Sequence, residues 1–197
     1  ILDRYLPKLK ERSIIAVTSK IVAICEGRIV PVESSDKDDL IRQEADLYLP
    51  KEENKYNLYL TIKNNQLAVS AGIDESNADD NYVLWPKDPQ GSANKIREHL
   101  TQKFGIKNLG VIITDSKTPP LRWGVIGASI AHSGFAALND LIGSEDLFGR
   151  KLKMTKASVI DGLAAPAVLV MGEGAEQTPI AVIADIPFVE FQNRNPT

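Results

Sequence analysis

The sequence is poor in the side chains that form disulfides and bind soft metals. Its 197 residues include a single cysteine, Cys25, and two histidines, His99 and His132. One cysteine excludes an internal disulfide and any zinc site built from several thiolates, and two histidines are too few for a histidine-rich metal centre. Oxygen-bearing side chains therefore remain as the candidate metal ligands.

The sequence also lacks a long apolar run and a strong excess of charge. Its longest apolar run, residues 163–171, is well short of the roughly 20 residues that a membrane helix needs. A net charge of −3 and a pI near 5.5 do not indicate a surface for nucleic acid. We therefore expect neither a membrane nor a nucleic acid as a partner.

The composition, with 43% hydrophobic and 25% charged residues, is typical of a soluble globular protein. A chain of this length fits one domain that spans residues 1–197. The absence of a visible signal peptide predicts a cytoplasmic location, and the start at Ile1 instead of Met leaves room for an upstream segment.

Hydrophobic periodicity predicts an α/β chain that contains both strands and helices. Strands are predicted at residues 13–18, 57–62, 67–73, 111–114, 124–130 and 178–191, and helices at residues 20–26, 36–49, 92–104 and 155–171. Ser19 is expected to cap the first of these helices, which would offer free backbone N–H groups to a phosphate. Lys20 in its first turn adds positive charge there, although a solvent-exposed lysine is the alternative.

Two of the predicted strands run into a carboxylate. Residues 111–114 precede Asp115 and Ser116, and residues 67–73 precede Asp74. Because open α/β sheets bind ligands at the carboxyl ends of their strands, we expect the two acids to lie within metal-bridging reach, with Ser116 beside them. The alternative is that each acid only caps the turn or helix that follows it.

Short motifs in a fixed order along almost the whole chain resemble those of one known family. They are Thr18-Ser19-Lys20-Ile21-Val22, Ala71-Gly72-Ile73-Asp74-Glu75-Ser76-Asn77, Pro86-Lys87-Asp88-Pro89, Ile112-Ile113-Thr114-Asp115, Phe148-Gly149-Arg150 and Val170-Met171-Gly172. By these motifs the sequence resembles the coenzyme F420 γ-glutamyl ligases, which use GTP to join a glutamate tail to a deazaflavin precursor. The resemblance implies an α/β fold with mixed sheets and flanking helices, in an intertwined homodimer.

The resemblance also implies site residues and cofactors. Mg²⁺ or Mn²⁺ would be held by Asp74, Asp115 and Ser116. GTP would be bound by Ser19, Lys20, Asn77, Met171, Gly172, Glu173, Gly174, Ala175, Glu176, Gln177 and Thr178. No catalytic residue is assigned.

The implied chemistry suits these residue types. A carboxylate does not condense with an amine in water because oxide is a poor leaving group, whereas an acyl phosphate reacts readily. Making the acyl phosphate requires phosphate charge to be neutralised, which a divalent metal on oxygen ligands does. We therefore expect a nucleotide- and metal-dependent γ-glutamyl ligase that joins an amino acid, L-glutamate, to an unidentified small-molecule carboxylate acceptor.

The sequence departs from the family motifs at three places, and the first two departures favour an alternative function. Ile24 stands where the family has a second lysine, residues 117–122 read Lys-Thr-Pro-Pro-Leu-Arg instead of Phe-Gly-Arg-Pro-Trp-Arg, and Gly162 replaces a glutamate. The alternative is a non-catalytic relative that acts as a nucleotide- or metal-binding or interaction module. The altered loop also predicts an acceptor that is smaller or less planar than a deazaflavin.

Overall fold

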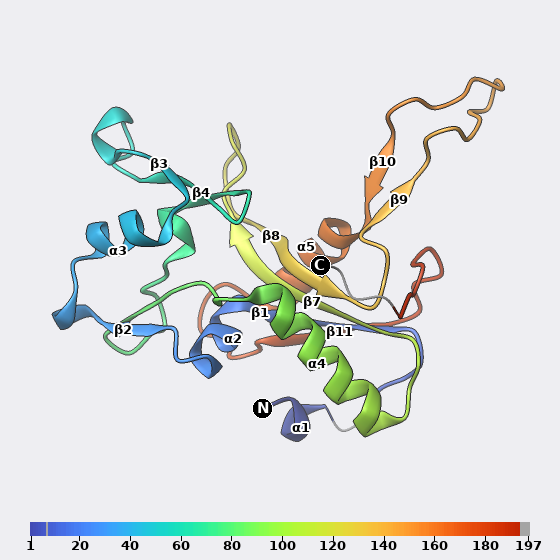
Figure 1. Cartoon of the computed structure of the whole chain (residues 1–197), viewed down its shortest axis with the longest axis horizontal. Helices are drawn as coiled ribbons and strands as arrows, with labels where there is room; N and C mark the ends of the chain where they lie inside the picture. Colours follow the sequence, from blue (N-terminus) through green and yellow to red (C-terminus); the bar gives the residue numbers. More distant parts are fainter. Residues whose placement is uncertain (7, 194–197) are drawn as a thin grey trace.

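The computed structural model describes residues 1–6 and 8–193, and its centre is a four-stranded mixed sheet (Figure 1). The strands lie in the order β11 (Ile180–Ile183), β1 (Ser13–Thr18), β7 (Leu109–Lys117) and β8 (Ile126–Ser133). β1 and β7 are parallel, and the other two pairs are antiparallel. The predicted strand at residues 13–18 is confirmed. The strand predicted at residues 111–114 is longer, and it does not end before the acid: Asp115 and Ser116 lie within β7 and pair with β8.

Two long helices cover the two faces of this sheet. Because side chains alternate along a strand, Ile15 and Ile113 pack with α4 (Pro89–Phe104), and Ile14 and Ile112 pack with α5 (Val159–Met171). Burial on both faces explains why β1 and β7 are apolar without a polar alternation. The sheet is therefore a rigid base for whatever its strand ends carry.

The remaining elements surround this central sheet and its two long helices (Figure 1). They are α1 (Leu2–Tyr5), α2 (Ser19–Cys25), β2 (Ile29–Pro31), η1 (Val32–Ser34), α3 (Lys37–Glu44), β3 (Leu47–Leu49), η2 (Lys51–Glu53), β4 (Leu60–Lys63), β5 (Gln66–Val69), η3 (Ser70–Gly72), β6 (Asn81–Val83), β9 (Leu138–Asp140) and β10 (Lys156–Ser158). β3, β4 and β5 form one small sheet, β2 pairs with β6, and β9 pairs with β10 at the base of a projecting arm. The fold is thus mixed α/β with several sheets and few helices.

Two predicted elements are wrong near the small sheet. The helix predicted for residues 36–49 ends at Glu44, because Leu47–Leu49 pairs with β4 as strand β3. Sequence periodicity could not foresee this pairing, which is a tertiary effect. The strand predicted for residues 67–73 ends at Val69, and the left-handed backbone of Ala71 (φ 53°) turns the chain into η3.

The C-terminal predictions require corrections of length. The helix predicted from residue 155 begins at Val159, since residues 156–158 pair as β10 and Ser158 is the N-cap. It continues through Pro166 to Met171. The last strand covers only Ile180–Ile183. No helix in the described part of the chain is long and apolar enough to cross a membrane.

Candidate active site

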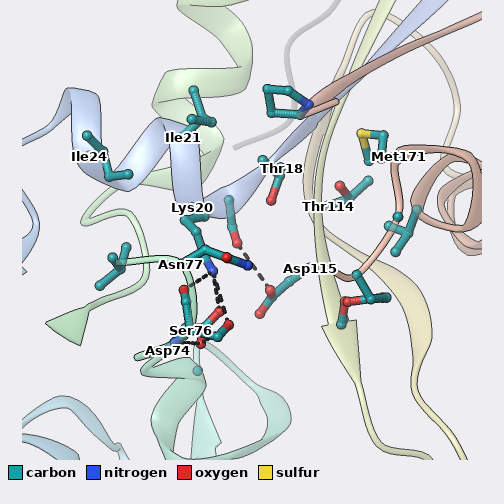
Figure 2. A pocket seen from close by; sticks show the side chains of 18 of the residues that line it. Thr18, Lys20, Ile21, Ile24, Asp74, Ser76, Asn77, Thr114, Asp115 and Met171 are labelled. Atoms are coloured by element: carbon teal, nitrogen blue, oxygen red, sulfur yellow. Dashed lines mark hydrogen bonds and ion pairs between the residues drawn. The ribbon is translucent and has the colours of Figure 1, made fainter. Parts of the chain in front are cut away.

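A cavity of about 820 Å³ opens where β1 and β7 end (Figure 2). Its walls come from residues 18–24, 69–85, 114–116 and 168–179, which are distant in the sequence. Every predicted site residue lines it: Ser19, Lys20, Asp74, Asn77, Asp115, Ser116, Met171, Gly172, Glu173, Gly174, Ala175, Glu176, Gln177 and Thr178. The structure therefore brings the sequence-predicted residues to one place.

Asp115 lines this cavity, and each of its carboxylate oxygens accepts a side-chain hydrogen bond. The Ser19 hydroxyl donates to Oδ1 at 3.1 Å, and the Trp85 indole N–H donates to Oδ2 at 2.5 Å. Burial raises the pKa of Asp115 to about 6, although the bonds from Trp85, Ser19 and the Ser116 backbone favour its ionised form. The negative charge of Asp74 raises that pKa further, so the two acids influence each other.

Asp74 faces the same cavity in a different environment. The Lys20 ammonium lies 2.6 Å from Oδ2, and the N–H and O–H of Ser76 both donate to Oδ1 at 2.8 Å. Partial burial acts to raise the pKa of Asp74, but Lys20 and Ser76 outweigh it and hold the pKa below its usual range. Lys20 therefore faces the cavity instead of solvent alone, as Figure 2 shows.

Ser19 does not have the capping role that was predicted for it. α2 begins at Ser19 with Thr18 as its N-cap residue, and no side-chain hydrogen bond caps the helix. The Ser19 hydroxyl reaches Asp115 instead. This hydroxyl therefore connects the first turn of α2 to the end of β7.

The loop at residues 171–178 is tied to the rest of the cavity by polar side chains. The Ser116 hydroxyl lies 2.6 and 2.8 Å from the two carboxylate oxygens of Glu173. The Asn77 amide donates to the Gly174 carbonyl at 3.0 Å. These contacts bring Glu173 next to a predicted metal-binding hydroxyl, a proximity that its place in the sequence did not indicate.

Trp85 and Gly72 are site residues that the sequence did not single out. A Cβ on Gly72, whose φ is +71°, would lie 2.1 Å from Trp85 Nε1, so only glycine fits against the indole. Trp85 belongs to an apolar stretch that precedes Pro86, and nothing in that pattern distinguishes it from a core residue. Its contact with Asp115 arises from the fold.

The three departures from the family motifs lie in different places. Ile24 lines the cavity, so an apolar side chain occupies a wall position there. Residues 117–122 follow Ser116 out of the cavity and into the exposed β7–β8 connection. Gly162 lies on α5 and is not a lining residue. Only the first departure therefore changes the cavity wall directly.

Comparison with known proteins adds independent findings. Residues 1–185, which include all the lining residues, match the family model described as F420-0:Gamma-glutamyl ligase. The chain is 32% identical to the Coenzyme F420:L-glutamate ligase of Methanocaldococcus jannaschii, over 95% of this chain and 82% of that protein. It is 35% identical to the Archaeoglobus fulgidus protein of the same name (89% and 76%) and 36% identical to that of Methanopyrus kandleri (80% and 58%).

Proposed function

The chain belongs to the F420-0:gamma-glutamyl ligase family, and we propose that it is a nucleotide- and metal-dependent ligase that joins L-glutamate to a carboxylate acceptor. The cavity at the ends of β1 and β7 is the proposed active site. The relatives that match are named as ligases of L-glutamate, which supports this choice of amino acid. GTP is the proposed nucleotide.

The observation that carries the proposal is the charge of the cavity wall. Its lining includes one lysine, Lys20, and five acids, which are Asp74, Asp79, Asp115, Glu173 and Glu176. A polyphosphate cannot bind in a cavity with such a negatively charged wall unless cations bind with it, because like charges repel strongly in a partly desolvated site. A nucleoside triphosphate bound together with divalent metals meets this requirement.

The residues present fit such metals. Asp74 and Asp115 supply carboxylate oxygens, and Ser116 with Glu173 supplies a hydroxyl beside a carboxylate. Within residues 1–6 and 8–193, no three acidic, histidine or cysteine side chains converge as a ready metal site. Mg²⁺ in nucleotide sites commonly takes one or two carboxylates and completes its shell with phosphate oxygens and water, so a dedicated cage is not required. The metals would supply charge neutralisation on the phosphates.

The proposed reaction proceeds in two displacements. A carboxylate oxygen of the acceptor attacks the γ-phosphorus of the nucleotide, which forms an acyl phosphate and releases the nucleoside diphosphate. The neutral amine of glutamate then attacks the acyl carbon, which forms the amide bond and releases inorganic phosphate. Asp74 would hold a metal, and Lys20, which pairs with Asp74 in the metal-free protein, would then supply its ammonium to a phosphate. Asn77 and the 171–178 loop are the proposed nucleotide-binding walls, and their contact with each other and their place in the cavity lining support this role.

The acceptor is proposed to differ from a deazaflavin. In this chain residues 117–122 carry Pro119, Pro120 and Leu121 and no aromatic side chain that could stack on a planar ring, and the first aromatic residue after Ser116 is Trp123, which is 99% exposed. A smaller or less planar carboxylic acid suits such a segment better. The deazaflavin precursor, supplied with GTP, Mn²⁺ and glutamate, is therefore expected to give little glutamylated product by mass spectrometry, and robust product would contradict this point.

A homodimer is part of the proposal. Large apolar side chains are exposed on the β7–β8 connection, on the projecting arm at residues 138–158 and late in α5. They are Leu121, Trp123, Leu147, Phe148, Met154, Leu169 and Val170. Extensive exposed apolar surface marks an interaction site. Light scattering at micromolar concentration should give twice the chain mass, and the double substitution Leu147→Ser with Phe148→Ser should lower it.

Turnover is tested with a panel of carboxylic acids labelled with ¹⁸O in the carboxylate. A substrate should release nucleoside diphosphate only when glutamate and metal are both present, and one ¹⁸O per turnover should appear in the inorganic phosphate. Transfer of label to phosphate is specific to an acyl phosphate. Release of diphosphate without transferred label would contradict the proposed chemistry.

The departure at Ile24 favours a second candidate, a non-catalytic relative that binds nucleotide and metal. Ile24 gives the cavity wall an apolar side chain where the family has a lysine, which removes one cation from the phosphate site. Saturable binding of nucleotide and metal without diphosphate release for any acceptor would favour this candidate. The substitution Ile24→Lys should then strengthen nucleotide binding.

A further inference from the structure

Asp74 and Asp115, two of the five acids that line the cavity, are joined through one short segment, Val83 to Trp85. Asp74 exchanges both backbone hydrogen bonds with Val83, at 2.9 and 2.8 Å. Two residues later, the indole of Trp85 donates to Asp115. The segment therefore holds Asp74 by its backbone and Asp115 by a side chain.

The indole itself is fixed from two sides. Trp85 is only 4% exposed, and its nitrogen-bearing edge lies against Gly72, two residues before Asp74. On the backbone side, Arg28 Nε donates to the Trp85 carbonyl at 3.1 Å, and the Arg28 guanidinium is paired with Glu44 at 2.5 Å. A ring held in this way has one orientation, so its N–H has a fixed direction.

We propose that Trp85 is a positioning residue that orients the Asp115 carboxylate for metal binding and sets its separation from Asp74. Indole N–H is a donor only, so it binds the ionised carboxylate and leaves one lone pair of Oδ2 free for a cation. The Ser19 hydroxyl donates to Oδ1, so the two hydrogen bonds together fix the plane of the carboxylate. Side chains that orient metal ligands in this way contribute about 10- to 100-fold to metal affinity.

This inference rests on the proposed function, and its test separates the two. Trp123 is 99% exposed, so the substitution Trp123→Phe leaves the buried Trp85 as the only tryptophan. Adding Mn²⁺ with GTP to that variant should quench the fluorescence emission of Trp85. The paramagnetic ion would be bound by the Asp115 carboxylate, which accepts a hydrogen bond from the indole. Binding of Mn²⁺ and GTP by calorimetry with unchanged Trp85 emission would overturn the inference.

The substitution Trp85→Phe keeps a ring and removes the N–H. Calorimetry with Mn²⁺ and GTP should show binding about 10- to 100-fold weaker than in the wild type. The matched control is Tyr59→Phe, which also removes a polar group from a buried ring, in this case the acceptor of the 2.7 Å bond from Arg42. It should change the affinity less than about threefold.

The outcomes differ for the two proposals. If the wild type binds Mn²⁺ and GTP and Trp85→Phe binds them equally well, the inference is wrong and the proposed function stands. If the wild type binds neither, both are wrong. Melting of each variant without ligand reports whether it is folded, and the emission test does not depend on the folding of Trp85→Phe.

Discussion

Asp74 and Asp115 are the same residue type after similar apolar stretches, and they face the same cavity, but their surroundings are opposite. Asp74 is paired with the Lys20 ammonium, and its pKa is lowered. The described residues that donate to Asp115 are all neutral, and burial raises the pKa of Asp115 to about 6. Lys20 thus stabilises Asp74 as an anion, whereas burial disfavours the ionised form of Asp115 although two hydrogen bonds hold its carboxylate in place.

The difference indicates separate tasks within one site. A buried carboxylate with neutral partners gains from any cation that arrives, so Asp115 is the stronger candidate for the first contact with a metal. Asp74 already has a cation, so a metal bound there as proposed would have to displace Lys20. The displaced ammonium would then be free to contact phosphate.

The largest expected effect is loss of metal binding in Asp115→Asn. An amide cannot replace an anionic ligand, so the affinity for Mn²⁺ in the presence of GTP should fall more than about 100-fold, beyond what orienting residues contribute. Asp74→Asn should also abolish metal-dependent stabilisation. The control is Asp79→Asn, which removes another carboxylate of the same cavity and should have little effect. Equal losses in all three variants would show that only the total charge matters.

The next largest effect is on how the stability of the metal-free protein depends on pH. Because the pKa of Asp115 is raised to about 6 in the folded state, its contribution to stability is complete below about pH 3.8 and is lost as the pH rises through 6. The loss is roughly 3 kcal/mol. Urea denaturation from pH 4 to pH 8 should show the wild type losing this amount relative to Asp115→Asn. A constant difference between the two proteins would contradict the assignment.

A smaller effect is expected from Lys20→Met, which removes the one cationic side chain among the described residues that line the cavity. Nucleotide affinity in the presence of Mn²⁺ should fall about tenfold, the contribution of one charge-assisted hydrogen bond. Lys20→Arg retains the charge and is the control. Unchanged affinity in Lys20→Met would mean that this ammonium serves Asp74 alone.

The smallest effect is on the metal-free stability of Asp74→Asn. The Asp74 side chain is 44% exposed, so solvent screens its pair with Lys20. We expect the variant to unfold less than about 1 kcal/mol more easily, as measured by urea denaturation at pH 7. The contribution of this pair is present above the unfolded-state pKa of Asp74 and is lost as the pH falls through the lower pKa of the folded state. A loss well above 1 kcal/mol would contradict this account.

Much of the site's composition could be predicted from sequence, because its residues occupy short motifs at strand and helix ends. Ser19, Lys20, Asp74, Asn77 and Asp115 are of this kind, and all line one cavity. The partners of these residues could not be predicted in the same way. The Trp85–Asp115 and Ser116–Glu173 contacts join segments far apart in the chain, and they depend on how those segments pack.

In the fold, too, elements that depend on local sequence could be predicted, and elements that depend on tertiary pairing could not. β1 was predicted with its observed ends because its six residues are apolar or small and are buried on both faces. The helix predicted through residue 49 was wrong because Leu47–Leu49 finds a strand partner in β4, which periodicity cannot register. The left-handed Ala71 is likewise imposed by the turn into η3.

The most direct test of the central claim is a thermal-shift matrix of GTP and ATP, each alone and with Mg²⁺ or Mn²⁺. A ligand at 100 times its Kd stabilises the folded state by about 2.7 kcal/mol, which raises Tm by roughly 5 to 10 °C for a chain of this length. The account predicts that GTP with Mn²⁺ gives such a rise, that neither component alone does so, and that Asp115→Asn shows none. An unchanged Tm for every nucleotide and metal pair at millimolar concentration would contradict it.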